Sequence, residues 1–153
     1  MSTPSQPRPP HDPHDPHDAA SVQVFNERTS IEAVHEALIT AVNRHGYSKA
    51  SKFAVRLALE EAIANAFHHG HRGLAEDLPV TVAFRVTPDE IHIAVEDQGP
   101  GFDPRSVPDP TLDENLEQPS GRGLMLIRAY MSDVSHSSRG NRLEMAYRRP
   151  ADG

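Results

Sequence analysis

The sequence predicts an α+β fold, a two-layer sandwich in which a mostly antiparallel sheet is covered on one face by helices. Two helical stretches come early, over residues 29–46 and 51–70. An apolar hairpin follows over residues 79–99, and a helix and a second hairpin occupy residues 121–149. Helices and antiparallel strands in this mixed order favour a single sheet with one helical layer.

The first elements are indicated by local patterns. Residues 21–27 alternate like a half-buried strand. In the first helix, Thr29 and Glu32 form a predicted capping box, and Gly46 is a suitable end. Apolar residues spaced three or four apart predict the face that packs on the sheet: Ile31, Val34, Leu38 and Val42. The second helix is rich in alanine and is closed by Gly70.

The later elements are two hairpins and a helix. Apolar residues alternate over 80–86 and 91–95 around a turn at 88–90, which predicts an antiparallel hairpin. Residues 121–134 predict a helix opened by glycines, and residues 134–149 predict a hairpin that turns at 139–141. Residues 102–120 hold four prolines and little periodicity. Such a long segment is typical of a functional lid or a disordered loop.

Composition excludes several classes of protein. The chain has 153 residues, 37% of them hydrophobic, and no run long enough to span a bilayer. It contains no cysteine, which excludes a disulfide-stapled secreted fold. With no apolar signal segment after Met1, we expect a cytoplasmic protein. The net charge of -7 argues against general nucleic-acid binding, so we expect protein partners and neither nucleic-acid nor membrane contact.

Residues 1–20 differ in kind from the rest of the chain. This segment repeats Pro-His-Asp three times and has almost nothing apolar to bury, so we expect a disordered tail before a domain that starts near Ser21. The alternative to a solvated tail is weak binding of a transition metal by the repeated residues, which are His11, Asp12, His14, Asp15, His17 and Asp18.

The stretch VEDQGPGFDP, residues 95–104, places an acid where an apolar residue is expected. Side chains two apart on a strand share a face, so Asp97 points the same way as Ile93 and Val95, toward the helices. An unpaired carboxylate there costs several kcal/mol. Either the strand frays and Asp97 turns to solvent, or Asp97 accepts a hydrogen bond from a ligand while Gly99 and Gly101 let the backbone close around it.

Two further groups of residues suggest a site. Glu61, Asn65 and His69 recur every four residues and share one helix face. An Asn oxygen suits Mg²⁺, and a nearby carboxylate suits a general base, although a surface stripe has the same spacing. Gly121, Arg122 and Gly123 open a helix, where bare amides and a guanidinium bind anions, although the same residues also suit a tight turn.

The three groups together, in this order, identify a resemblance. LALEEAIANAFHHG, VEDQGPGFDP and SGRGLMLIRAYMSDV resemble the three boxes of the histidine-kinase-like ATPase superfamily, which has a Bergerat-type fold. Within it, the chain is similar to the anti-sigma-factor serine/threonine kinases. The resemblance covers residues 21–148 and implies an ATP-binding domain over residues 21–150.

The resemblance implies a role for each matching residue. Asn65 would ligate Mg²⁺ on the ATP phosphates, Glu61 would be the catalytic base, and Asp97 would accept from the adenine amino group. Gly99 and Gly101 would shape the adenine pocket. The residues that would hold the phosphates under the lid are Gly121, Arg122, Gly123 and Leu124.

Neighbouring polar residues are assigned other roles. Glu60 lies about 100° around the helix from Glu61 and is not expected to be the base. His69 matches the first box and is interpreted as a helix-end contact. His68 and His71 are expected on the surface, since their spacing gives poor tetrahedral geometry for zinc.

The chain departs from the family near the lid. Some members carry an arginine just before the lid-closing glycines, whereas here Pro119 precedes them and Arg122 lies between them. This puts the catalytic rate in doubt more than nucleotide binding.

The resemblance implies a kinase that phosphorylates an anti-anti-sigma protein, sequesters a sigma factor and forms a homodimer. One alternative is a nucleotide-gated binding module without kinase activity. Another is the catalytic domain of a two-component histidine kinase, because His35-Glu36 mimics a phosphoacceptor dipeptide. The helical hairpin that carries such a histidine has no room here, so His35 is interpreted as a surface residue.

Overall fold

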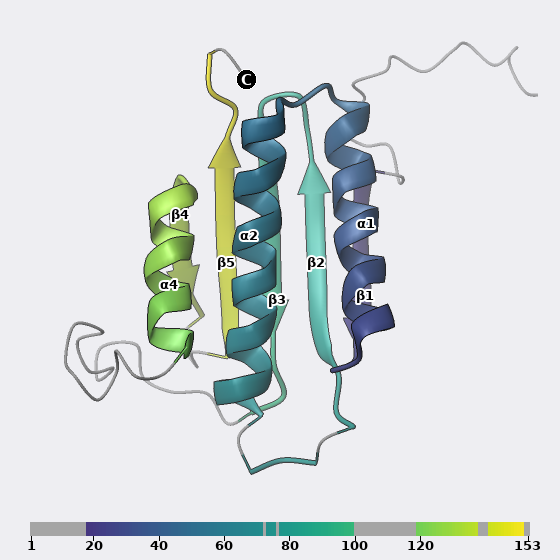
Figure 1. Ribbon diagram of the computed structural model, residues 1–153, viewed down its shortest axis with the longest axis vertical. Coiled ribbons are helices and arrows are strands. Elements are labelled where there is room, and N and C mark those ends of the chain that lie inside the picture. Colours follow the sequence, from purple (N-terminus) through teal and green to yellow (C-terminus); the bar gives the residue numbers. More distant parts are fainter. Residues whose placement is uncertain (1–17, 72, 76, 100–118, 138–140, 152–153) are drawn as a thin grey trace, which may run out of the picture.

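The protein is a two-layer sandwich of helices on an antiparallel sheet, as the computed structural model shows (Figure 1). The structure describes residues 18–71, 73–75, 77–99, 119–137 and 141–151. The helices lie on one face of the sheet in Figure 1, and this arrangement confirms the predicted fold class. Within these residues, no helix is both long enough and apolar enough to span a membrane.

The sheet has five strands in the order β1-β2-β3-β5-β4. Their bounds are Ala19–Val24, Val80–Val86, Glu90–Glu96, Asp133–His136 and Arg142–Arg148 for β1 to β5. Every neighbouring pair is antiparallel. The predicted β2–β3 hairpin is present, with Val82 opposite Val95 and Phe84 opposite Ile93. β3 therefore lies in the centre of the sheet, and its last residues sit beside the start of β5.

In the part of the chain that the structure describes, three helices and a π-helical turn cover the sheet. Their bounds are Arg28–Arg44 for α1, Lys49–Asn65 for α2, Ala66–Gly70 for the π-helical turn η2, and Pro119–Tyr130 for α4. Gly46 follows α1 with a φ of 71°, a backbone conformation that favours glycine, so it ends the helix as predicted. The Ser48 side chain caps α2 by accepting from the Ser51 N–H.

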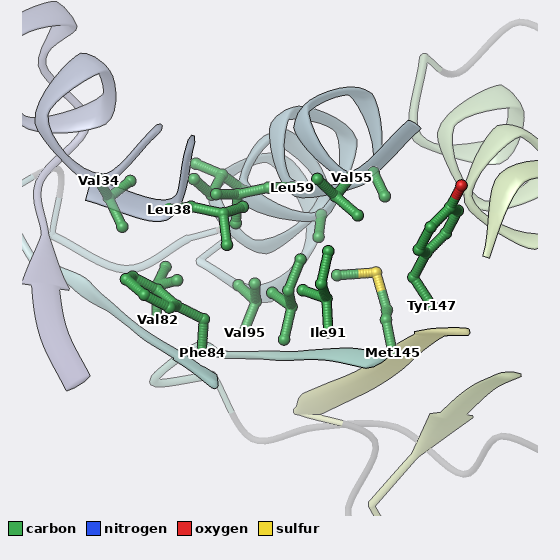
Figure 2. Packing of buried hydrophobic residues seen from close by; sticks show 14 of the residues in the cluster. Val34, Leu38, Val55, Leu59, Val82, Phe84, Ile91, Val95, Met145 and Tyr147 are labelled. Atoms are coloured by element: carbon green, nitrogen blue, oxygen red, sulfur yellow. The ribbon is translucent and has the colours of Figure 1, made fainter. Parts of the chain in front are cut away.

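The core fills the space between the helices and the sheet (Figure 2). Val34, Leu38, Val55 and Leu59 point down from α1 and α2 onto the side chains of β2, β3 and β5. Each fully buried side chain of this kind contributes about 1.5–3 kcal/mol. This rigid layer holds the C-terminal end of α2 against the C-terminal end of β3.

Two local predictions are wrong. The cap of α1 is Glu27 and makes no side-chain cap bond, while Glu32 pairs with Arg28 at 3.1 Å instead of forming a capping box with Thr29. The interpretation of His35 as a surface residue fails because this side chain is only 6% exposed.

The domain also begins earlier than expected. β1 starts at Ala19, and the Asp18 side chain is 1% exposed, so three residues assigned to the tail belong to the fold. Asp18 contacts Arg44 and His45 at the end of α1. The other histidines and acids of the repeat lie outside the described residues.

Candidate functional site

The candidate site lies at one end of the sandwich, where α2, β3 and α4 approach one another (Figure 1). Glu61 and Asn65 occupy the last turns of α2, and Gly123 lies in the N-terminal part of α4. Asp97 directly follows β3. The fold thus brings together residues from all three motifs.

Glu61 and Asn65 share one small space beside α4. A Cβ atom added to Gly123 would lie 2.7 Å from Glu61 Oε2 and 3.3 Å from Asn65 Oδ1. A side chain at position 123 would therefore require the Glu61 carboxylate to move. The absence of a Cβ lets α4 approach the polar end of α2 closely.

Asn65 has the chemistry of a cation ligand. Its Oδ1 is buried and has no hydrogen-bond partner among the described residues. Buried carbonyl oxygens normally accept a hydrogen bond, so this one calls for a partner that the described part of the chain does not supply. A hard cation such as Mg²⁺ binds oxygen ligands of this type, so the residue fits the group that the sequence resemblance implies.

The surroundings of Glu61 raise the pKa of its carboxyl group, which favours proton acceptance. Burial raises the pKa of its carboxyl group above the ordinary value, and the negative charge of Glu60 raises it further. Glu60 itself is exposed, which agrees with its assignment away from the site. A carboxylate with a raised pKa is a better general base near neutral pH.

Asp97 lies at the edge of the same end and does not turn away into solvent. It is half-buried, and its Oδ1 accepts from the Gly99 N–H at 2.8 Å. β3 ends at Glu96, but the Asp97 N–H still donates to Asn141 O at 2.9 Å. The backbone therefore continues the pairing of the strand by one residue beyond its end.

Glycines allow the π-helical turn to touch the loop after β3. A Cβ at Gly70 would lie 2.1 Å from Asp97 Cγ, and one at Gly99 would lie 1.9 Å from Gly70 O. The latter is backbone and cannot rotate away. These two glycines let the end of α2 and the Asp97 loop approach within van der Waals contact.

The other predicted residues fall in three groups. Gly121 and Arg122 lie in the first turn of α4, where helix amides point outward. The Leu124 side chain packs against the core, so any contact with phosphate would come from its backbone. Gly101 and most of the segment 102–120 lie outside the described residues, as does the side chain of His69.

The sequence interpretation missed two residues of this end. His71 was expected on the surface, but its side chain is 8% exposed and its Nε2 accepts from the Gln98 N–H at 2.9 Å. Asn141, interpreted only as a turn residue, donates from Nδ2 to Asp97 O at 3.2 Å. Both partners are distant in the chain, so no local pattern could reveal these contacts.

The fold and the site define the class of protein. A helix layer over an antiparallel sheet, with an Asn and a Glu facing glycines at one end, is the arrangement expected for an ATPase of the histidine-kinase type. The chain matches the family model for the histidine kinase-like ATPase domain over residues 25–147. It therefore belongs to the histidine kinase-like ATPase domain family, which confirms the resemblance inferred from the sequence.

Similar proteins extend this result. The chain is 34% identical over 98 residues to the serine-protein kinase RsbW of Oceanobacillus iheyensis, covering 60% of this chain and 61% of the relative. It is 30% identical over 102 residues to the serine/threonine-protein kinase BtrW of Bordetella bronchiseptica, covering 63% and 68%. The chain thus spans about three fifths of the length of the RsbW proteins that it matches.

A solved structure supports the fold. The structure of the RsbU and RsbW domains of a Mycobacterium tuberculosis protein aligns with a TM-score of 0.57 at 16% identity. The alignment covers 87% of this chain and 33% of that one. At this identity the likeness concerns the fold alone.

Proposed function

We propose that the protein is an ATP-dependent serine/threonine protein kinase that acts as an anti-sigma factor. It phosphorylates an anti-anti-sigma protein and, in its other state, sequesters a sigma factor. The observation that carries this proposal is the convergence of Glu61 Oε2 and Asn65 Oδ1 beside Gly123, at the N-terminal end of α4. The similarity to serine/threonine-protein kinases supports the choice of hydroxyl groups as phosphate acceptors.

In this proposal the Asp97 carboxylate accepts a hydrogen bond from the adenine amino group of ATP. Gly99 and Gly101 line the adenine, and the first turn of α4, which includes Gly121 and Arg122, holds the phosphates, with Gly123 and Leu124 in the next turn. Mg²⁺ bound at Asn65 Oδ1 would neutralise charge on the phosphates.

Glu61 then accepts the proton of the acceptor hydroxyl. The hydroxyl oxygen forms a bond to the γ-phosphorus, the bond between that phosphorus and the β,γ-bridging oxygen breaks, and ADP leaves with the electron pair. Positioning and charge neutralisation supply most of the rate enhancement in phosphoryl transfer. The raised pKa of Glu61 suits it to take up the proton.

The remaining parts of the proposal concern assembly. In this proposal the ATP-binding domain predicted over residues 21–150 begins already at Asp18, and the protein works as a cytoplasmic homodimer. Light scattering of the purified chain after gel filtration measures its mass directly. A mass of one chain at micromolar concentration would contradict the homodimer.

The test of the kinase uses Glu61→Gln with Glu60→Gln as its matched control. Each protein is incubated with Mg²⁺, γ-labelled ATP and a lysate of the source organism, and acid-stable label on serine or threonine of a small protein is measured. Glu61→Gln should lower phosphotransfer by about 10²–10⁴-fold because the general base is lost. ATP affinity should stay within about threefold, since the change removes less than 1 kcal/mol of binding.

Glu60→Gln should retain phosphotransfer to within about threefold, because the Glu60 side chain is exposed and its charge is only the smaller cause of the raised pKa of Glu61. Label that persists in Glu61→Gln would contradict the assigned base. No label with the wild type, together with intact ATP binding, would favour the nucleotide-gated binding module over the kinase.

A further inference from the structure

His71 is a buried polar residue directly after the π-helical turn. The His71 N–H donates to Ala66 O, five residues back, at 3.0 Å, so the wide turn of η2 determines where the side chain is placed. The imidazole packs edge-on against Phe67, with ring centroids 5.6 Å apart. π-Helical turns occur often at functional sites, and this one begins directly after Asn65.

The His71 ring acts as a hydrogen-bond acceptor. Its Nε2 lies 2.9 Å from the backbone nitrogen of Gln98, and a backbone N–H can only donate a hydrogen bond. A ring nitrogen that accepts carries no proton, so the imidazole is neutral with its proton on Nδ1. The Gln98 side chain donates separately to Pro79 O at 2.9 Å and leaves the His71 contact undisturbed.

The bond from Gln98 fixes the peptide unit that carries Asp97. The Asp97 carbonyl and the Gln98 N–H belong to one planar peptide group. Asn141 Nδ2 donates to that carbonyl at 3.2 Å, while His71 accepts from the N–H on the other side. The plane is therefore held at both ends, and the Asp97 carboxylate projects from a backbone with little freedom to rotate.

The carboxylate itself is oriented by the same loop. Asp97 Oδ1 accepts from the Gly99 N–H at 2.8 Å, which sets the side-chain rotamer relative to the fixed peptide. Loss of the His71 bond would free the Gln98 peptide and, with it, the Gly99 amide that orients the carboxylate. His71 thus affects the Asp97 carboxylate through the Gln98 peptide and the Gly99 amide.

We propose that His71 is a positioning residue for recognition of the adenine 6-amino group by Asp97. The inference rests on the proposed ATP binding and adds to it the residue that determines selectivity for the base. His71 and Asn65 flank the same π-helical turn. This turn therefore connects the proposed cation ligand, Asn65, to the residue that holds the Asp97 loop. His71 is expected to affect base recognition because its hydrogen bond is with Gln98, in the loop that carries Asp97.

The experiment measures dissociation constants for ATP and for purine riboside triphosphate, which lacks only the 6-amino group. Three variants of the full chain are compared with wild type. His71→Phe keeps a ring against Phe67 but removes the acceptor, and His71→Gln restores an acceptor at a similar reach. His68→Phe makes the same chemical change at an exposed position of η2 and serves as the control.

His71→Phe should weaken ATP binding by about tenfold, because one hydrogen bond that orients the site contributes about 1–1.5 kcal/mol. It should weaken binding of the analogue by less than about twofold, a few tenths of a kcal/mol. The preference for ATP over the analogue therefore collapses in His71→Phe, recovers in His71→Gln and is unchanged in His68→Phe. Equal losses for both nucleotides, or no loss, would overturn the inference and leave ATP binding standing.

A measurement on the wild type covers the case in which His71→Phe does not fold. Long-range proton–nitrogen NMR of the imidazole should show the proton on Nδ1 and a bare Nε2. A proton on Nε2 would overturn the inference. Wild-type protein that binds neither nucleotide would overturn the proposed function and this inference together, an outcome distinct from binding without discrimination.

Discussion

The two ends of the sandwich differ in whether their buried polar groups have hydrogen-bond or charge partners. At the end with the candidate site, Asn65 Oδ1 is buried without a partner among the described residues and Glu61 has a raised pKa. At the other end, near the C-terminus in Figure 1, polar groups are matched. The two carboxylate oxygens of Asp18 contact Arg44 and His45.

Arg149 shows how complete the matching is at that end. Its guanidinium donates to three carbonyl oxygens, those of His45, Gly46 and Pro88, at 2.8–3.2 Å. It also lies over the Tyr47 ring, 4.4 Å from the centroid. Burial raises the pKa of Tyr47 to about 12, so its hydroxyl stays protonated and donates to Thr87 O.

This difference between the two ends indicates which polar groups stabilise the fold and which are available for function. Matched polar groups at the Arg149 end join α1, the β2–β3 turn and the end of β5, and so they stabilise the fold. Unmatched groups at the site end weaken the fold and are retained where a ligand can complete them. Substitutions at the two ends should therefore affect different measurements.

The largest effect is expected for Asn65→Ala. Phosphotransfer should fall by about hundredfold or more, because a bound metal ion supplies several kcal/mol of stabilisation in the transition state. The free energy of unfolding should be unchanged or up to about 1 kcal/mol higher, since alanine favours the helix and the unpartnered oxygen is removed. Enzyme assays and urea denaturation measure the two quantities. A loss of more than about 2 kcal/mol in the free energy of unfolding would contradict the proposal that Asn65 serves function and not stability.

Asp18→Ala should have the next largest effect, on stability alone. It removes the buried carboxylate that Arg44 and His45 contact, which should lower the free energy of unfolding by about 2–3 kcal/mol after allowing for the partial exposure of Arg44. ATP affinity at a temperature where the variant is folded should match wild type. A variant as stable as wild type would show that this cluster does not hold the domain together.

Arg149→Lys tests the geometry of the same end. Lysine keeps the charge but cannot donate to three carbonyls at once or stack flat on Tyr47, so stability should fall by about 1–2 kcal/mol. Thermal unfolding with ATP binding as a parallel readout measures this change. An equal stability in both proteins would indicate that charge alone is responsible.

His35 adds to the comparison because it is buried, lies outside both ends and has no partner at Nδ1 within the described residues. Burial, and secondarily the charge of Arg56, lowers the pKa of His35 below its ordinary value, and the charge of Glu60 opposes this shift. Since the folded protein binds the proton less readily than the unfolded chain, stability is full above about pH 6.5 and falls as the pH drops below it.

His35→Leu should remove this part of the pH dependence and keep phosphotransfer unchanged. Urea denaturation between pH 5 and pH 8, run beside wild type, measures the effect. Identical slopes in the two proteins would exclude His35 as the source. A loss of phosphotransfer would show that this unpartnered group also has a function.

Sequence patterns were sufficient for the elements and for the motif residues. Alternation over β2 and β3 and the three-four spacing in α1 reflect which face is buried, a property of residues close in the chain. The motif residues Glu61, Asn65, Asp97 and Gly123 could be named because their types and order are specific. The bounds were less accurate: α4 begins at Pro119, two residues before the predicted start, and α2 ends in a π-helical turn.

Only the tertiary structure decided which polar groups are buried and what they contact. His71 meets Gln98 across 27 positions, Asn141 meets Asp97 across 44, and His45 meets Asp18 across 27. A hydrogen bond between residues so far apart depends on how whole elements pack, and neither helix nor strand periodicity carries that information. The sequence by itself therefore determined the fold class and the residue types at the candidate site, whereas packing determined the residues that hold the site in place.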